Sequence, residues 1–119
     1  EASAFDYCTN LSSVQLSKTL EKLGGNAFGH CNNLTDIEIP KSLTTADHGN
    51  SYYGYDSAYG PFSKGGLRNV TFEEGTIEVS TGLFVACPNI ESVELPDSIV
   101  RIEGFAFSHN KNLKNIKNY

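Results

Sequence analysis

Three cysteines and three histidines are among the side chains of this 119-residue chain that could serve as nucleophiles, bases or metal ligands. His30 and Cys31 are neighbours, and a cysteine beside a histidine suggests a nucleophile with its base. Such a pair works only when the two side chains face each other, whereas sequence neighbours in a turn usually point apart. His30 and His109 stand one residue before Cys31 and Asn110, which are matching repeat positions, so we expect both imidazoles at the surface of a turn.

Two loop segments contain residues found in phosphate or metal sites, but their spacing does not fit either kind of site. Residues 60–66, GPFSKGG, lack the Gly-Lys-Ser/Thr ending and the following helix of a phosphate loop. Residues 47–51, DHGNS, offer oxygen ligands without the spacing and closing Glu of a calcium loop. We therefore predict no enzyme activity, no catalytic residue, no metal site and no cofactor.

The cysteines share one column of an internal repeat, in which each follows a phenylalanine by three residues. The five phenylalanines of this column are 23, 34, 22 and 23 residues apart, so the long interval contains an insertion of about a dozen residues. They are Phe5, Phe28, Phe62, Phe84 and Phe107. Gly65 replaces the cysteine in the third copy and Asn110 replaces it in the fifth.

Each repeat combines two apolar periods. Phe28, Cys31 and Leu34 are spaced by three, which predicts a short helical turn. Ile37 and Ile39 alternate with polar residues, which predicts a short strand with one buried face. A second apolar pair follows each predicted strand: Leu20 with Leu23, Leu43 with Ala46, Ile77 with Val79, and Ile99 with Ile102. Because one unit cannot bury its apolar side alone, we predict an α/β solenoid of about five stacked coils, each with one short parallel strand and one short helical turn.

The pattern AFxxCxxLxxIxIPxxL is exact over residues 27–43 and resembles the BspA-like class of leucine-rich repeats. The resemblance covers nearly the whole chain, apart from Gly65 and the 47–60 insertion. It implies a leucine-rich-repeat solenoid that belongs to a larger surface or secreted protein. It also implies adhesion to host proteins, matrix or other cells, and hence an extracellular or cell-surface location.

The repeat explains the cysteines and asparagines structurally. We expect Cys8, Cys31 and Cys87 to be reduced, buried core residues, because stacked coils place them in one column with parallel side chains. A second column contains asparagines, which we interpret as turn formers whose side chains bond to nearby backbone. Its members are Asn10, Asn33, Asn89 and Asn112.

The polar positions of the predicted strands form two exposed columns. The first contains Ser13, Asp36, Asn69, Ser92 and Asn115. The second contains Gln15, Glu38, Thr71, Glu94 and Lys117. The middle of this face is polar and acidic, and its candidate binding residues are Asp36, Glu38, Thr71 and Glu94. The alternative is a face that is merely solvated, since any soluble solenoid must expose polar residues.

The insertion, residues 47–60, is rich in Tyr, Gly, Ser, Asn and Asp. This is the composition of antibody contact loops, because tyrosine rings give large contact areas at low entropic cost. Tyrosine beside aspartate also suits a sugar. The alternative is a loop that folds back on the solenoid wall. The candidate binding residues here are Tyr52, Tyr53, Tyr55 and Tyr59.

Charge and hydropathy restrict the partners. The chain has 9 basic and 14 acidic residues, a net charge of −5, and no apolar run long enough to span a membrane. We therefore expect a single monomeric domain over residues 1–119, which is a fragment of a longer protein. We also expect that this domain binds no nucleic acid and does not insert into a membrane. The expected partner is a protein of a host or neighbouring cell surface or of the matrix, or a glycan. The alternatives are a structural spacer and a carbohydrate-binding module.

Overall fold

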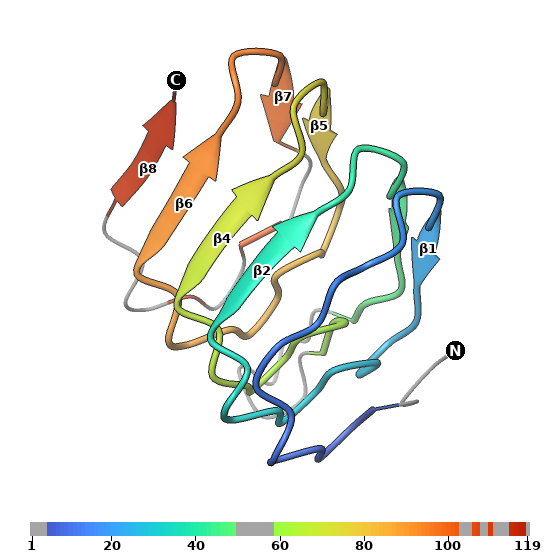
Figure 1. The fold of residues 1–119 in the computed structure, drawn as a ribbon, viewed down its shortest axis with the longest axis vertical. Coiled ribbons are helices and arrows are strands. Elements are labelled where there is room, and N and C mark those ends of the chain that lie inside the picture. Colours follow the sequence, from blue (N-terminus) through green and yellow to red (C-terminus); the bar gives the residue numbers. More distant parts are fainter. Residues whose placement is uncertain (1–4, 50–58, 103–105, 108–109, 111–114, 119) are drawn as a thin grey trace.

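The computed structural model describes residues 5–49, 59–102, 106–107, 110 and 115–118. Its main feature is a four-stranded parallel sheet in the order β2-β4-β6-β8 (Figure 1). The strands are β2 (Asp36–Ile39), β4 (Asn69–Phe72), β6 (Ser92–Leu95) and β8 (Asn115–Asn118). They pair without slippage, so that Asp36 aligns with Asn69, and Asn69 with Ser92. The register matches the columns predicted from the sequence.

A second set of strands lies across the core from this sheet. It consists of β1 (Lys22–Leu23), β3 (Thr45–Ala46), β5 (Glu78–Val79) and β7 (Arg101–Ile102). They form two parallel two-stranded sheets, β1-β3 and β5-β7 (Figure 1). The second apolar pair of each repeat coincides with these strands, which direct Leu23, Ala46 and Val79 inward. The prediction of one strand per coil was therefore incomplete.

The predicted helical turns are not confirmed, and no helix occurs in the part of the chain that the structure describes. The Phe-to-Cys segments are hydrogen-bonded turns instead. The residue before the cysteine column has a left-handed backbone in four coils, with φ between 55° and 62° at Tyr7, His30, Lys64 and Ala86. A left-handed residue cannot continue a right-handed helix, so the chain turns toward the next strand.

One stack of phenylalanine rings runs through the core and joins the coils. Successive ring centroids are 5.2, 5.5, 5.7 and 5.5 Å apart from Phe5 to Phe107. Phe62 and Phe84 in the middle are at most 1% exposed, whereas Phe5 is 49% exposed. The first coil also lacks a regular strand where one was predicted, around Ser13 and Gln15. The core is therefore best formed in the central coils.

Candidate binding surface

The main sheet brings four predicted site residues onto one face. Asp36 and Glu38 are exposed on β2, Thr71 is half-buried on β4, and Glu94 is exposed on β6. The register aligns Glu38 with Thr71, and Thr71 with Glu94. Inward neighbours such as Val70 and Val93 are fully buried, which fixes the outward direction of the polar side chains.

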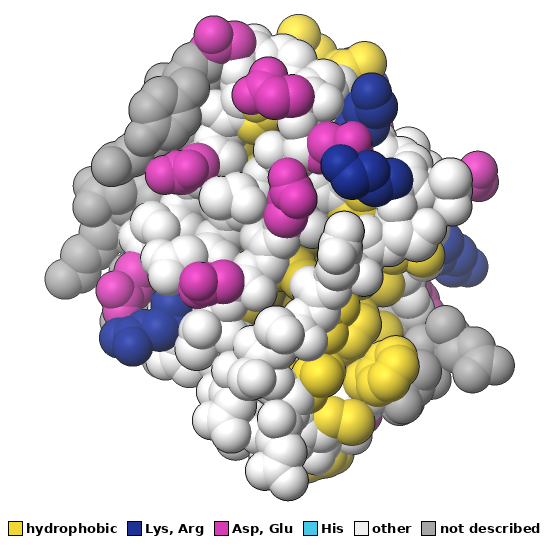
Figure 2. All heavy atoms as spheres, viewed as in Figure 1, with side chains coloured by type: hydrophobic (Ala, Val, Ile, Leu, Met, Phe, Trp, Pro, Cys, Tyr) yellow, Lys and Arg dark blue, Asp and Glu magenta, His cyan; other side chains and the backbone are white. Residues whose placement is uncertain are grey.

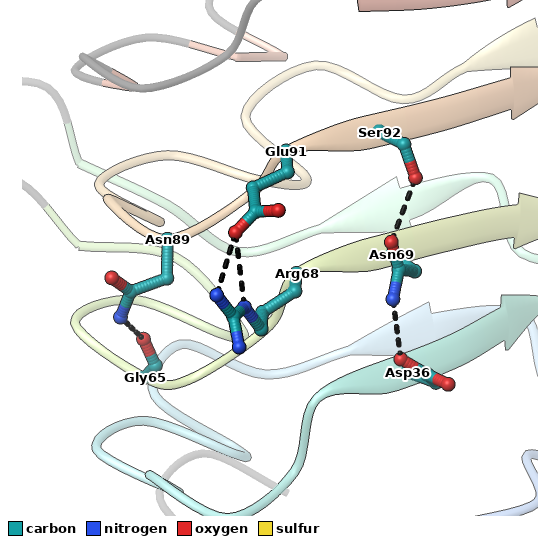
Figure 3. Close-up of polar contacts among 7 residues, drawn as sticks. All are labelled: Asp36, Gly65, Arg68, Asn69, Asn89, Glu91 and Ser92. Carbon is teal, nitrogen blue, oxygen red and sulfur yellow. Dashed lines mark hydrogen bonds and ion pairs between the residues drawn. The ribbon is translucent and has the colours of Figure 1, made fainter.

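The first polar column forms a hydrogen-bonded chain across three strands (Figure 3). Asn69 Nδ2 donates to Asp36 Oδ1 over 3.0 Å, and Ser92 Oγ donates to Asn69 Oδ1 over 2.8 Å. These bonds connect the three neighbouring strands on the exposed face of the sheet. The first column therefore has a structural role and presents fewer unsatisfied groups than its composition suggests.

The described side chains of the second column make fewer hydrogen bonds within the protein than those of the first column. Thr71 Oγ1 donates to the Ile37 carbonyl over 3.4 Å. Within the described residues, neither Glu38 nor Glu94 has a side-chain hydrogen bond or an ion pair. Two exposed carboxylates thus stand on either side of a threonine on the sheet, and the register aligns Glu94 with Lys117 of β8 on its other side.

A hollow of about 420 Å³ lies beside the second column, between the 12–14 segment and strands β2 and β4. Val14 and Ile37 supply its apolar part, and hydroxyl, amide and carboxylate groups supply the rest. The polar lining residues are Ser12, Ser13, Thr35, Asp36, Glu38, Asn69 and Thr71. The hollow therefore combines acidic and hydrogen-bonding groups, which suit a long basic side chain.

Two described cations near this face, Arg68 and Lys18, are paired with other carboxylates. Arg68 Nε and Nη2 contact Glu91 Oε2 at 3.1 and 2.7 Å (Figure 3). Lys18 Nζ lies 3.4 Å from Glu73 Oε2. The backbone N–H of Lys41 donates to Glu73 Oε1 over 2.9 Å, and this bond is the main reason why the pKa of Glu73 lies below its ordinary value. Figure 2 shows carboxylates spread over this face with few cations among them.

The cysteine column is structural. All three thiols are free, with Cys31 and Cys87 buried and Cys8 half-buried, so the prediction of complete burial was wrong for Cys8. Cys31 Sγ donates to the Phe5 carbonyl over 3.1 Å, and Cys87 Sγ donates to the Phe62 carbonyl over 3.4 Å. Burial raises the pKa of both thiols, which disfavours the nucleophilic thiolate.

Asn110 replaces the cysteine in the fifth copy and makes the same kind of bond to the preceding coil. Its Nδ2 donates to the Phe84 carbonyl over 2.8 Å, just as the buried thiols donate to the carbonyl of the preceding phenylalanine. In three copies a small side-chain donor at this position reaches the preceding coil, whereas Gly65 in the third copy has none. The repeat contained a signal for this bond, because asparagine replaces cysteine in the last copy of the column, but the bond was not predicted from it.

The asparagine column also connects coils. Asn33 Nδ2 donates to the Thr9 carbonyl over 2.6 Å, and Asn89 Nδ2 donates to the Gly65 carbonyl over 3.0 Å (Figure 3). The expectation that these side chains bond within the local turn was wrong, because each bond crosses to the coil before. The Asn10 side chain has no such bond within the described residues, and Asn112 lies outside them.

His30 does not act with Cys31. Its Nδ1 lies 3.0 Å from Asp6 Oδ1, and its ring stacks on Tyr7 with centroids 4.0 Å apart. The Cys31 thiol donates instead to the Phe5 carbonyl. This arrangement supports the interpretation of the adjacent pair as a structural feature of the turn.

The base of the insertion is closed by a backbone bridge. The N–H of Gly49 donates to the Tyr59 carbonyl and the N–H of Tyr59 to the Gly49 carbonyl, both over 2.8 Å. The Tyr59 ring lies against the backbone of Gly25 and Gly49, and a Cβ at Gly25 would come within 2.8 Å of it. Tyr59 therefore anchors the insertion and is 37% exposed. The other candidates of the insertion, Tyr52, Tyr53 and Tyr55, lie outside the described residues.

Comparison with known proteins identifies the repeat. The family model of the BspA type leucine rich repeat region matches residues 1–57 and 58–118, in six copies. The count of about five coils from the sequence is not confirmed. No curated protein and no solved structure matches the chain.

Two further findings limit the kinds of site. In the ranges that the structure describes, no three His, Cys, Asp or Glu side chains gather in a way that would hold a metal ion. Nor do those ranges contain a helix of the length and apolar character that a membrane span requires. The matched family typically provides non-catalytic binding modules in surface or secreted proteins. On the strength of its matched copies and its parallel coils, this chain belongs to the BspA-type leucine-rich-repeat family.

Proposed function

We propose that this chain is a non-catalytic binding module of an extracellular or cell-surface protein, and that it contacts a partner protein through the exposed face of its main sheet. The observation that carries the proposal is the row Glu38, Thr71 and Glu94. Neither carboxylate has a side-chain hydrogen bond or ion pair in the described part of the chain, and Glu38 lines a hollow of about 420 Å³.

The chemistry of this face favours a basic partner segment. A lysine or arginine side chain gains a charge-assisted hydrogen bond from each carboxylate that it reaches. Its aliphatic part fits the apolar side of the hollow, at Val14 and Ile37. Because such contacts lie near the surface, they mainly increase the association rate and make binding sensitive to salt.

The Tyr-rich insertion supports a second candidate contact, to a protein or a glycan. The bridge between Gly49 and Tyr59 holds the two described residues that flank the segment side by side. An interface centred on aromatic anchors would be less sensitive to salt than one on the acidic row. Proteins or glycans of a host cell, a neighbouring cell or the matrix are the proposed partners in both cases.

The experiment compares three variants for binding to immobilised matrix proteins, a glycan array, and a Lys-Ser peptide that serves as a basic probe. Glu38→Gln with Glu94→Gln removes the carboxylates of the acidic row. Glu21→Gln with Glu74→Gln is the control, because it changes the net charge equally away from β2, β4 and β6. A third variant changes Tyr52, Tyr53 and Tyr55 to Ser and keeps Tyr59, which anchors the insertion.

If the acidic row binds, the first variant loses binding to the basic peptide at low salt, and the control retains it. Loss only in the tyrosine variant, at low and high salt alike, would favour the insertion instead. If all three variants bind as the parent does, neither proposed contact is responsible for binding, and the structural-spacer alternative remains.

A further inference from the structure

The second set of strands is interrupted in the middle of the molecule. β3 pairs with β1 and β5 pairs with β7, but β3 and β5 do not pair with each other in the described structure. The main strands of the same two coils, β2 and β4, pair over four residues. The second and third coils are therefore joined along the main sheet and open on the wall across the core from it.

A backbone bond that joins neighbouring coils on this wall is missing at the interruption. The Thr44 N–H donates to the Glu21 carbonyl over 3.0 Å, and the Val100 N–H donates to the Ile77 carbonyl over 2.8 Å. By the register of the repeat, the corresponding bond at the interruption would run from the Ile77 N–H to the Thr44 carbonyl. It is not formed, so a backbone donor and a backbone acceptor are left unpaired among the described backbone groups.

A side-chain bond between coils is missing at the same place. Ser42 Oγ in the second coil and Ser98 Oγ in the fourth each donate to a carbonyl of the preceding coil, over 2.6 and 2.7 Å. The matching residue of the third coil is Gly75, which has no side chain to make this bond. The sequence of the third coil therefore omits a contact that closes the wall elsewhere.

A hollow of about 330 Å³ lies at the interruption, next to the N-terminal ends of β3 and β5. Leu43 and Ile77 supply its apolar part, and Ile77 is 57% exposed. Thr44 also lines the hollow, so both unpaired backbone groups border it. The Lys41 side chain lies over Gly75 at the same place, since a Cβ at Gly75 would be 3.4 Å from Lys41 Cδ.

The charged groups around the hollow favour a carboxylate. Arg101 Nε contacts Glu78 Oε2 at 2.6 Å, so this carboxylate already has a cation. Lys41 Nζ has no ion pair among the described residues. The hollow thus has two cations and one carboxylate in its lining, the opposite balance from the acidic row of the main sheet. A carboxylate that reaches Lys41 gains a charge-assisted hydrogen bond.

We propose that an extended segment of a partner protein binds at this interruption as an added strand, and that an acidic side chain of the segment contacts Lys41. A bound strand supplies an N–H for the Thr44 carbonyl and a carbonyl for the Ile77 N–H, which are the groups that lack partners. The argument is continuity with the strand pairing that already joins β1 to β3 and β5 to β7. This site goes beyond the proposed function, because it lies on another wall and selects an acidic segment.

The test is an NMR titration of the full, isotope-labelled chain with a short peptide of alternating valine and threonine and one central glutamate. One control peptide has glutamine in place of the glutamate. Another is N-methylated at its central residues, which removes their N–H donors. The amides of Ile77 and Glu78 report binding at the interruption, and those of Glu38 and Thr71 report binding at the main sheet.

The glutamate peptide is expected to shift the Ile77 and Glu78 amide signals until they saturate, and to leave those of Glu38 and Thr71 unchanged. The N-methylated peptide is expected to cause no saturable shift. Lys41→Gln is expected to weaken binding about two- to fivefold, as is the glutamine peptide, because an exposed ion pair contributes little. Lys22→Gln on β1 changes the charge equally away from the hollow, so it should bind as the wild type does. The spectra also establish that each variant is folded.

Three results would overturn the proposal. The first is a glutamate peptide that causes no saturable shift at Ile77 up to about 10 mM, a range that covers weak association. The second is an N-methylated peptide that binds as tightly as the parent peptide, since strand pairing would then not be responsible. The third is a set of shifts confined to Glu38 and Thr71, which would place the binding on the main sheet.

Discussion

The first coil and the central coils have the same sequence pattern but differ in burial. Phe5 is 49% exposed, whereas Phe62 and Phe84, in the same column, are at most 1% exposed. The segment around Val14 forms no regular strand, whereas the matching residues Val70 and Val93 are fully buried in β4 and β6. The difference lies in the neighbours, because a central coil is covered on both sides and the first on one. Burial in this fold is thus a property of the stack rather than of the repeat unit.

The largest expected difference between the two regions is in thiol reactivity. Cys8 is half-buried, whereas Cys87 is buried and its thiol has a pKa raised by burial. In native buffer, a thiol reagent is expected to modify Cys8 faster than Cys87 by a factor of at least about 10³, because Cys87 requires opening of the fold. Mass spectrometry of timed reactions measures both rates, and similar rates would contradict the burial difference.

The next largest difference concerns the phenylalanine stack. Phe62→Ala removes a fully buried ring between two neighbours, and should lower the free energy of unfolding by about 3–5 kcal/mol. Phe5→Ala removes a ring that is already half in water, so we expect half of that loss or less. Urea unfolding of both variants measures the contrast. Equal losses would show that the first coil is as well packed as the centre.

A smaller contrast is expected in the asparagine column. Asn89→Ala leaves the Gly65 carbonyl without its side-chain donor and should cost about 1 kcal/mol. Asn10 is exposed and has no such bond within the described residues, so Asn10→Ala should leave the free energy of unfolding unchanged within error. If Asn10→Ala cost as much as Asn89→Ala, the first coil would carry an equivalent bond.

The smallest effect concerns a contact that links the two regions, between Lys18 of the first coil and Glu73. The Lys41 backbone N–H contributes most to the lowered pKa of Glu73, ahead of Lys18. A lowered pKa in the folded state means that the ionised carboxylate stabilises the fold. That stabilisation is present above the ordinary glutamate pKa and is lost as the pH falls through the lowered pKa. Lys18→Ala should therefore raise the Glu73 pKa only slightly in an NMR titration. A full return to the ordinary value would contradict this ranking.

The main sheet and its exposed columns could be predicted because their signals are periodic. Alternation over Ile37 and Ile39, repeated in register, determines which side chains face outward and which strands pair. The acidic row follows directly from this register. Residue identity also predicted the buried phenylalanine stack, because apolar side chains that recur at one spacing are buried when successive coils stack on each other.

Other parts were hidden from the sequence for physical reasons. The second strands are two residues long, too short to show a period of two. The turn after the phenylalanine resembles a helical turn in spacing, and its left-handed residues, such as His30 and Ala86, are not the glycines that usually mark this conformation. The anchoring of Tyr59 on Gly25 depends on a contact between distant segments.

Native-state hydrogen exchange tests the central claim, that neighbouring coils supply the burial of each repeat. The amides of Val70 in β4 and Val93 in β6 are expected to exchange only through global unfolding. The amide of Val14 in the first coil is expected to exchange by local opening, at a rate that is orders of magnitude faster. Equal protection at Val14 and Val70 would contradict the claim, because a coil covered on one side would then be as stable as a coil covered on both.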